Sequence, residues 1–401
     1  MIFTNPLLLK DKKILIGVSS SIAIYKILDL ISMLKKLGAD IRVVMTEEAK
    51  KFVTPLCFEA LTHTKVLHLQ SEDWSNGCNH IDYAKWADVF LIAPTTANTL
   101  AKISYGIADN LLLSTLLASK APKLIAPAMN TQMLENPKTQ ENISKLRKDG
   151  FKIIATRSCL LACDTFGDGA LATPKEIVFN LIREFYSHSF YKNKRVMITG
   201  GGSKENIDLV RCISNHSSGL QASALALAFY FLGANVTFIS SIFPQELPNS
   251  IQQIKVASAK EYLEAIKTNL TEEKTYLIMS AAIADFIPKN SYNTKIKKQD
   301  QKNLTLELER NIDILESLNQ KNLVKIGFKA ELDKNNAIDC AKKMLETKNC
   351  ACVCLNILSN HNTFGSQNNE MILFSKDKQK QIPLSSKLQV AFEIADFLTL
   401  L

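Results

Sequence analysis

Short apolar runs alternate with helical patterns along the whole chain, and this alternation restricts the possible folds more than any other feature. In the first half the apolar runs are residues 14–18, 41–45, 89–93 and 124–126, with helical spacing between them. Continuous apolar runs of this length are typical of strands buried on both faces of a parallel sheet. Strands that alternate with helices predict a doubly wound α/β domain.

The same pattern starts again after a polar stretch at residues 187–193. The apolar runs of the second half are residues 195–199, 236–239 and 276–279. The first of them is followed by a Gly/Ser loop, residues 200–203. We therefore expect the second half to begin as the first half does, with a strand, a loop of small residues and a helix. Since 401 residues exceed one compact core, the sequence predicts two doubly wound, Rossmann-like domains, residues 1–188 and 189–401.

Small and hydroxyl residues follow the strands of the first half. Residues 19–21 are serines, Thr46 follows the second strand, residues 94–98 follow the third and Asn130 follows the fourth. The carboxyl ends of parallel strands build the ligand crevice of such sheets, and a helix N-terminus beside them binds phosphate. Each stretch alone is equally typical of an ordinary capped loop. Together they favour a flat cofactor with a phosphate tail, although no GxGxxG or Walker lysine motif is present.

Two stretches of the first half carry groups that transfer protons. His80 precedes an amphipathic helix; such a histidine is usually a cap or a core residue, but near a crevice it is a candidate base. Cys159 and Cys163 precede the glycine-bearing residues 167–169, and we interpret this stretch as a mobile loop. The cysteine pair has two interpretations, a metal site or a flap that carries a reactive thiol.

The second half contains an acidic residue and a basic cluster at a similar place. Asp285 follows a predicted strand, and the basic residues 295–298 open a predicted hairpin whose return strand is residues 304–308. The cluster is either a solvated face or a clamp for a triphosphate, with Asp285 facing a metal or a ribose. The cysteines of residues 350–354 alternate at the strand period, and we assign them to the core.

The composition is that of an ordinary globular protein, with 22% charged residues and a net charge of +9 from 48 basic and 39 acidic residues. A modest, dispersed excess of positive charge is compatible with binding to nucleic acid and with binding to anionic phosphate substrates, and it does not distinguish between them. The N-terminal residues do not resemble a secretory signal, and nine cysteines therefore indicate a reducing cytoplasm. Residues 222–243 are apolar but interrupted, which predicts a helix and a strand, not a membrane span.

Taken together, the motifs of both halves resemble a known family. Those of the first half are residues 22–26, 79–81, 94–100, 106–111 and 127–130, which resemble flavin-dependent cysteine decarboxylases. Those of the second half are residues 201–205, Ile207, Asp208 and residues 215–219, 281–285 and 295–298, which resemble phosphopantothenate–cysteine ligases. Over essentially its whole length the chain resembles the bifunctional bacterial enzymes of coenzyme A synthesis, which fuse a phosphopantothenoylcysteine decarboxylase to such a ligase.

For the first half, the resemblance implies a flavodoxin-like domain that binds flavin mononucleotide (FMN). It makes His80 the catalytic histidine, Asn130 the ligand of the substrate carboxylate and Cys163 the acid of the flap. The residues that would hold FMN are Ser19, Ser21, Thr46, Pro94, Thr95, Thr96, Ala97, Asn98 and Met129. The flap departs from the family pattern because Asp164 follows Cys163.

For the second half, the resemblance implies a Rossmann-like ligase domain with an added hairpin. It gives catalytic roles to Asn215 and Lys295, and Asp285 would face a magnesium ion. The positions that match the site for cytidine triphosphate (CTP) are Ala281, Asp285, Lys295, Asn311, Ile312, Asp313, Ile314, Phe328 and Lys348. Ile312 stands where the family has proline, and Met344 where it often has lysine.

The implied reactions are consecutive. The ligase uses CTP to convert 4′-phosphopantothenate into an acyl-cytidylate, which L-cysteine attacks; the decarboxylase then forms 4′-phosphopantetheine with FMN. The expected partners are these small molecules and neither nucleic acid nor membrane. Family analogy also implies a cytoplasmic homo-oligomer of trimeric decarboxylase and dimeric ligase domains, for which a dodecamer is one closed combination.

Three alternative functions make different predictions. A two-domain dehydrogenase requires a GxGxxG with a downstream ribose-binding acid, and neither half has one in register. A nucleic-acid-binding flavoprotein requires basic and aromatic residues along one face, whereas the basic residues here are dispersed apart from residues 295–298. A ligase half that serves only for oligomerisation has no need of Asp285 and Lys295.

Overall fold

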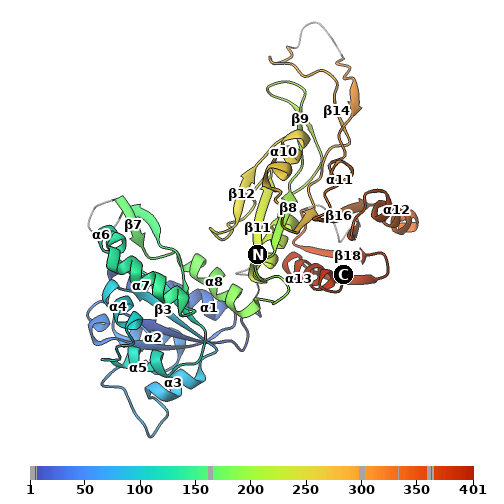
Figure 1. The fold of residues 1–401 in the computed structure, drawn as a ribbon. Helices are drawn as coiled ribbons and strands as arrows, with labels where there is room; N and C mark the ends of the chain where they lie inside the picture. The colour runs from blue at the N-terminus through green and yellow to red at the C-terminus, as the bar shows by residue number, and fades with distance from the viewer. Residues whose placement is uncertain are drawn as a thin grey trace. The chain divides into compact units, whose positions relative to one another are not determined.

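The structure is a computed structural model of the 401-residue chain, and it describes residues 5, 7–160, 166–297, 303–332, 334–358, 363 and 365–401. The chain divides into two compact units, Met1–Phe185 and Tyr186–Leu401 (Figure 1). The division falls close to the boundary expected at residue 189.

The first unit is built on a parallel sheet with the strand order β2-β1-β3-β4-β5. Its strands are β1 (Lys13–Val18), β2 (Asp40–Met45), β3 (Val89–Thr95), β4 (Lys123–Pro127) and β5 (Lys152–Ile153). Strand β1 pairs in parallel with both β2 and β3. The strand order therefore reverses beside β1, which places the topological switch point, where ligands bind in such sheets, between β1 and β3.

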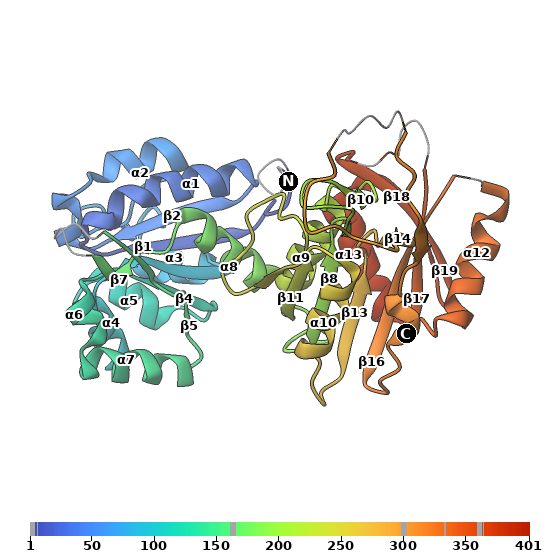
Figure 2. The ribbon, with the colours of Figure 1, turned by 90° about the horizontal axis from the view of Figure 1, so that it is seen from above.

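Helices cover both faces of this sheet. They are α1 (Lys26–Lys36), α2 (Pro55–Thr62), α3 (His80–Trp86), α4 (Ala97–Ser104), α5 (Leu111–Ala118), α6 (Thr131–Glu135), α7 (Pro137–Lys148) and α8 (Pro174–Tyr186), with the 3-10 turns η2 (Ile22–Tyr25) and η3 (Glu47–Lys51). Apolar side chains of α3, α4, α5 and α7 form one core with the sheet, while α1 and α2 lie on the opposite face (Figure 2). The doubly wound prediction is confirmed for this unit.

The stretch that we interpreted as a mobile loop contains a hairpin on its described sides. Strand β6 (Arg157–Leu160) pairs antiparallel with β7 (Phe166–Ala170). Cys159 lies on β6, whereas Cys163, with Asp164, lies outside the described residues.

The second unit contains a larger sheet with the order β12-β11-β8-β13-β16-β17-β18-β19. Its strands are β8 (Arg195–Gly200), β11 (Asn235–Ser240), β12 (Gln252–Lys255), β13 (Thr275–Met279), β16 (Leu323–Glu331), β17 (Cys352–Ile357), β18 (Asn368–Phe374) and β19 (Gln379–Ser386). The strands from β12 to β17 are parallel, as predicted, and the switch point lies between β8 and β13. Strands β18 and β19 extend the sheet antiparallel, which the sequence did not predict.

The helices of the second unit also form two layers. They are α9 (Leu220–Phe231), α10 (Ala259–Asn269), α11 (Ile314–Ser317), α12 (Lys334–Thr347) and α13 (Lys387–Leu398). Helices α10, α11 and α12 share a core with one face of the sheet. On the other face α9 and α13 pack side by side (Figure 2), so α9 is buried around most of its circumference and is apolar on nearly every side.

The prediction that a helix follows the glycine loop 200–203 is wrong. The loop leads into β9 (Lys204–Asn206), which pairs with β10 (Cys212–Ser214), and α9 begins only after Gly219. The loop turns tightly, because Gly201 has φ +77° and a Cβ there would lie 2.3 Å from Ser241 Oγ. It therefore packs against the residues after β11 instead of starting a helix.

The predicted pairing of residues 295–298 with 304–308 is also wrong for the described residues, since residues 295–297 and 303–307 form no strand; residue 298 lies outside them. The paired strands are β14 (Phe286–Pro288) and β15 (Leu308–Arg310), and Lys295 lies in the segment between them. Contacts of the neighbouring Ile296 explain the difference. Its N–H donates to Asp208 (3.1 Å), and its carbonyl accepts from Arg211 (2.8 Å), which ties this segment to the turn between β9 and β10.

The cysteines of residues 350–354 are structural. Cys352 and Cys354 are buried on β17, as predicted, while Cys350 precedes the strand and is partly exposed. Burial raises the pKa of the Cys350 thiol to about 11, which keeps it protonated at neutral pH. Within the described part of the chain, no three His, Cys, Asp or Glu side chains are grouped to hold a metal ion.

Candidate active sites

Ser19 joins the ends of β1 and β3 at the switch point of the first unit. Its buried hydroxyl donates to the Pro94 carbonyl (2.7 Å) and accepts from the N–H of Thr96 (3.2 Å). The hydroxyl of Thr95 also turns inward and donates to the Ile92 carbonyl (2.7 Å). These expected flavin residues therefore hold the carboxyl ends of β1 and β3 together through contacts within the protein.

Four other expected residues are N-caps. Ser21 caps η2, Thr46 caps η3, Thr96 caps α4 and Asn130 caps α6; in each, the side-chain oxygen accepts from a backbone N–H of the following turn. All four turns begin at the carboxyl edge of the sheet, because its strands are parallel. The other N–H groups of such first turns are the donors that bind phosphate groups at this edge in α/β proteins.

The hairpin of β6 and β7 is attached to the loop that carries Asn130. The Met129 N–H donates to the Gly169 carbonyl (2.9 Å), and the Thr131 hydroxyl donates to the Asp168 carbonyl (2.6 Å). Gly169 has φ +115°, and a Cβ there would lie 2.4 Å from the Met129 oxygen. The base of the flap and the Asn130 loop therefore form one structural unit, and glycine is required where they meet.

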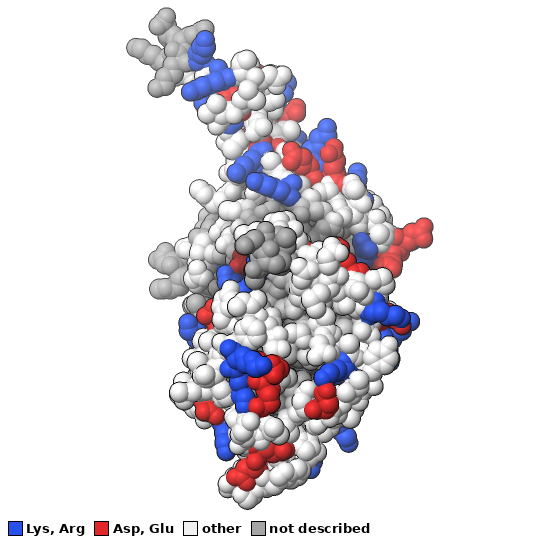
Figure 3. All heavy atoms as spheres, turned by 90° about the vertical axis from the view of Figure 1, so that its left-hand side faces the viewer, with Lys and Arg blue, Asp and Glu red and all other residues white. Residues whose placement is uncertain are grey.

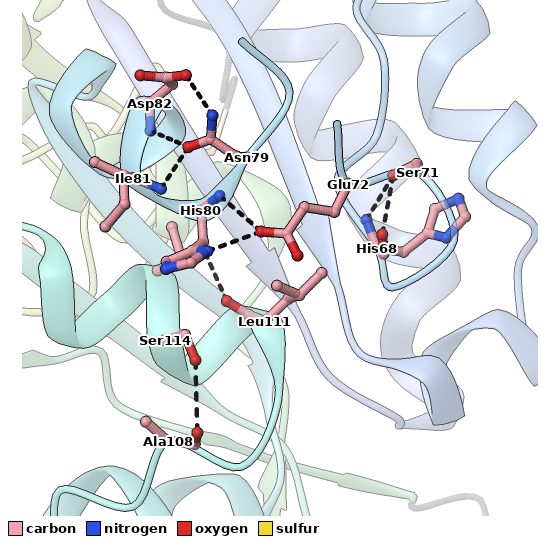
Figure 4. A network of polar contacts seen from close by, with 11 residues as sticks. His68, Ser71, Glu72, Asn79, His80, Ile81, Asp82, Ala108, Leu111 and Ser114 are labelled. Carbon is pink, nitrogen blue, oxygen red and sulfur yellow. Dashed lines mark hydrogen bonds and ion pairs between the residues drawn. The ribbon is translucent and has the colours of Figure 1, made fainter. Parts of the chain in front are cut away.

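His80 is the first residue of α3, and a carboxylate holds its ring (Figure 4). Nδ1 lies 2.8 Å from Glu72 Oε1, and the Trp74 ring meets the imidazole edge-on with centroids 5.4 Å apart. Asn79 fixes the helix start by accepting from the N–H groups of residues 81 and 82. Since Nδ1 faces the carboxylate, Nε2 is the ring nitrogen directed away from Glu72. The sequence analysis missed Glu72, because no spacing rule links it to the histidine.

At the switch point of the second unit, hydrogen bonds join the end of β8 to the loop that follows β13. The Ser280 hydroxyl donates to the Thr199 carbonyl (2.6 Å), and the Ala281 N–H donates to the Thr199 hydroxyl (3.2 Å). The Ala282 N–H donates to the Gly201 carbonyl (2.8 Å). The glycine loop and the loop after β13 therefore lie together, as expected for residues at a switch point.

A cavity of about 830 Å³ opens at this edge of the second unit. Its walls are the approach to α9, the loop after β13, the segment around α11, and parts of β16 and α12. The expected ligase residues that line it are Asn215, Ala281, Asp285, Asn311, Ile312, Asp313, Ile314, Phe328 and Lys348. Lys295, by contrast, is exposed and is not among the described residues that line the cavity.

Asn311 bridges two walls of the cavity. Its N–H donates to the Asp285 carbonyl (2.8 Å), and its Nδ2 donates to the Ala284 carbonyl (2.8 Å). Its Oδ1 accepts from the N–H of Ile312 (2.8 Å). The predicted nucleotide loop is thereby fixed to the loop that presents Asp285.

Asp313 is the N-cap of α11 and forms an ion pair with Lys348 at 2.7 Å. Burial alone would raise the pKa of Asp313, but hydrogen bonds from Lys348 and from the Glu316 N–H outweigh it, so the pKa lies below its usual value. The carboxylate is therefore charged at neutral pH and forms a salt bridge with the Lys348 ammonium.

Asn215 lies on the opposite wall, exposed toward the cavity. Its Nδ2 donates to the Ile283 carbonyl (3.0 Å). A Cβ on Gly202 would lie 2.4 Å from the Asn215 backbone oxygen. The glycine of the loop after β8 therefore permits the close approach of the segment that carries this asparagine.

Lys325 on β16 was missed by the sequence analysis. Its buried ammonium donates to the carbonyls of Leu315 and Leu318, each at 2.9 Å, and so closes the C-terminal end of α11. Desolvation lowers its pKa. A lysine flanked by the apolar residues Val324 and Ile326 is atypical, and that signal could have identified it.

On the face drawn in Figure 3, basic and acidic side chains are interspersed and wide areas carry neither. Of the helices in the described ranges, none has the length and apolar character needed to cross a membrane.

Comparisons with known proteins connect the two units to two families. Residues 3–186 match the family model described as Flavoprotein. Residues 191–400 match the family model of the DNA/pantothenate metabolism flavoprotein C-terminal domain. Together with the fold, these matches define a two-part α/β flavoprotein of pantothenate metabolism.

The coenzyme A biosynthesis bifunctional protein CoaBC of Bacillus subtilis is 39% identical over 395 residues, which cover 96% of either chain. That of Borreliella burgdorferi is 38% identical, over 97% of this chain and 99% of the relative. The chain belongs to this family of bifunctional coenzyme A biosynthesis proteins, and it is an enzyme with a decarboxylase and a ligase part. A crystal structure of the C-terminal domain of a family member is 31% identical and covers 52% of this chain and 95% of that domain, with a TM-score of 0.43.

Proposed function

We propose that residues 1–188 decarboxylate 4′-phosphopantothenoylcysteine with FMN and that residues 189–401 ligate 4′-phosphopantothenate to L-cysteine with CTP and magnesium. The observation that carries this proposal is the cavity of the second unit. It gathers two asparagines, two aspartates and a lysine from the segments expected for a nucleotide-dependent ligase, in one chain with a flavoprotein unit.

The residues of the first unit fit FMN. The first turns of η2 and α4 offer backbone N–H groups for the phosphate, and the buried contacts of Ser19 and Thr95 preshape the crevice. Pro94, Ala97, Asn98 and Met129 would complete the surface around the flavin. When bound, FMN supplies the reversible two-electron oxidation of the carbon that bears the substrate sulfur, which a direct decarboxylation lacks.

The proton transfers of the decarboxylase fall to the chain itself. His80, oriented by Glu72, would take the thiol proton through Nε2. Asn130, whose Oδ1 caps α6, would bind the substrate carboxylate, the role that the family resemblance gives it. Cys163 would return the proton in the last step from the flap.

The residues of the second unit fit a nucleotide with its magnesium ion. Asp285 is one carboxylate in the cavity, and magnesium in such sites is commonly held by one or two carboxylates and the substrate phosphates. The segment 311–314 and Phe328 would surround the nucleoside. Asn215 would orient the acyl group for attack by the amine of cysteine.

Lys295 would neutralise charge on the phosphates during acyl-cytidylate formation. Lys295 does not line the cavity of its own chain. We therefore propose that the ligase domains are dimers, in which each chain supplies Lys295 to the cavity of the other. For the first unit we propose trimers; Ile22, Tyr25, Leu56 and Trp74 are each more than half exposed, and association would cover such residues. We also propose that the oligomer is cytoplasmic.

The test follows the two products separately. Pure protein is incubated with phosphopantothenate, cysteine, magnesium and CTP while pyrophosphate and carbon dioxide are measured. We expect a yellow protein with a flavin spectrum, pyrophosphate release that needs CTP, and carbon dioxide release that also needs cysteine. A colourless folded protein that cannot be reconstituted with FMN would contradict the first part, and the absence of pyrophosphate would contradict the second.

A further inference from the structure

One wall of the cavity in the second unit contains a buried lysine that the reactions above do not use. Lys387 is the first residue of α13, is 5% exposed and lines the cavity. Among the described residues, no carboxylate or other acceptor contacts its ammonium, which is not completely shielded from solvent. Burial lowers the pKa of this lysine.

Three contributions make the charged form of this lysine unfavourable in the folded protein. It has lost most of its hydration, it has no described counter-charge, and it lies at the N-terminus of a helix, where the helix dipole disfavours a cation. Buried lysines are almost always paired. The free chain therefore holds a cation that is destabilising until an anion arrives.

The neighbours of Lys387 hold it in place and leave another polar atom unsatisfied. Asn369 is 3% exposed and lines the same cavity; its Oδ1 has no partner among the described atoms. Its Nδ2 donates to Gln221 Oε1 (3.1 Å), and Gln221 Nε2 donates to the Lys387 carbonyl (3.2 Å). These amides connect β18, the first turn of α9 and the first turn of α13.

The start of α9 adds backbone donors to the same wall. Its N-cap is Gly219, which has no side chain to bond the first-turn N–H groups, and Gly219 and Gln221 both line the cavity. The N-terminus of α9 and the lysine at the start of α13 therefore face one space. Donors and positive charge in this combination recognise a multiply charged anion.

We propose that Lys387 binds the terminal phosphates of the nucleoside triphosphate and holds the pyrophosphate that leaves. The inference rests on the proposed ligase function. The segment 311–314 and Phe328 would take the nucleoside end, and Asp285 the metal between. A substrate carboxylate oxygen bonds to the α-phosphorus, the bond from that phosphorus to the bridging oxygen breaks, and its electron pair leaves with pyrophosphate. Lys387 neutralises the charge that this group gains.

The test compares Lys387→Met, which keeps the length and removes the charge, with Lys342→Met on the exposed side of α12. Binding of inorganic pyrophosphate and of cytidine monophosphate is measured by calorimetry on the full-length protein. We expect Lys387→Met to weaken pyrophosphate binding about 10- to 100-fold, the size of one charge-assisted hydrogen bond. Binding of the monophosphate and both constants of Lys342→Met should not change.

Two further readouts separate this role from a structural one. Removal of an unpaired buried charge should raise the melting temperature of the ligand-free protein, so a Lys387→Met chain that melts earlier or does not fold contradicts the proposal. The KM for CTP should rise while that for phosphopantothenate stays. Unchanged pyrophosphate binding with a raised KM for phosphopantothenate would assign Lys387 to that phosphomonoester and overturn the proposal. A wild-type protein that binds no nucleoside triphosphate and releases no pyrophosphate would instead refute the ligase function itself.

Discussion

Asp313 and Lys348 form a 2.7 Å ion pair that joins the N-cap of α11 to the residue after α12. The pair lies on the cavity wall of the second unit, between the two segments that enclose the expected nucleotide. Its strength therefore influences both the stability of this unit and the position of the loop that begins at Asn311.

Acid should weaken this unit through Asp313. Its folded pKa is lower than the ordinary value of about 3.9, so its contribution to stability is complete above that value and is lost as the pH falls through the folded pKa. We expect the free energy of unfolding to fall with acidification more steeply in the wild type than in Asp313→Asn. Urea unfolding between about pH 6 and pH 3 measures this, and equal slopes would contradict it.

Gly169→Ala should disable decarboxylation. The new Cβ would lie 2.4 Å from the Met129 oxygen at φ +115°, so the Asn130 loop and the flap must move apart. Misplacement by about 1 Å can lower a rate about 100-fold. Gly150→Ala is the matched control, because Gly150 has φ +88° but nothing within 4 Å of a Cβ. Carbon dioxide release from added phosphopantothenoylcysteine should fall only in Gly169→Ala; an equal loss in both variants would mean that backbone strain alone matters.

Glu72→Gln should lower turnover of the decarboxylase without loss of flavin. The carboxylate orients His80 through Nδ1 at 2.8 Å, and an amide can present its NH2 group there and turn the ring. We expect kcat to fall about 10- to 100-fold with little change in KM. Glu48→Gln, at an exposed ion pair with Lys51, is the control. Normal turnover of Glu72→Gln would remove the carboxylate from the mechanism.

Lys325→Met should destabilise the second unit, in contrast to Lys387→Met. The ammonium of Lys325 bonds two carbonyls of the α11 region, and their loss leaves buried acceptors unsatisfied. We expect a cost of about 1–3 kcal/mol in the free energy of unfolding and a raised KM for CTP. Exposed Lys321→Met serves as control. If Lys325→Met and Lys387→Met changed the melting temperature in the same direction, the distinction between a paired and an unpaired buried lysine would be wrong.

Lys295→Gln should reduce pyrophosphate release about 10²- to 10³-fold, because it removes a charge-stabilising contact. CTP binding should weaken less than turnover, since the contact is made mainly in the transition state. Carbon dioxide release from added phosphopantothenoylcysteine should stay normal. Lys297→Gln, from the same segment, should behave as the wild type. Unaltered pyrophosphate release in Lys295→Gln would return this lysine to a solvated surface.

Features set by local sequence were predicted well. The parallel strands, the small residues at their ends and the two doubly wound sheets follow from apolar periodicity and from capping chemistry, both of which act over a few residues. Asp285 and Asn311 were assigned to one site through family motifs, and the structure places their segments together. Features set by tertiary contacts were missed. The pairing of β14 with β15 depends on Asp208 and Arg211 from a distant turn, and no local pattern connects Glu72 to His80 or Asn369 to Lys387.

The N-caps at the carboxyl edge of the first sheet have a consequence for how this unit could change in evolution. Ser21, Thr46 and Thr96 use their side-chain oxygens to start helical turns, and serine, threonine, asparagine and aspartate do this almost equally well. Exchanges among these four residue types should therefore accumulate with little loss of phosphate binding, which depends on the main chain. By the same reasoning, exchanges among these N-cap residues would change the substrate specificity of the unit very little. New specificity would have to arise in the flap and in the loop it contacts, where any side chain in place of Gly169 would meet the backbone of Met129.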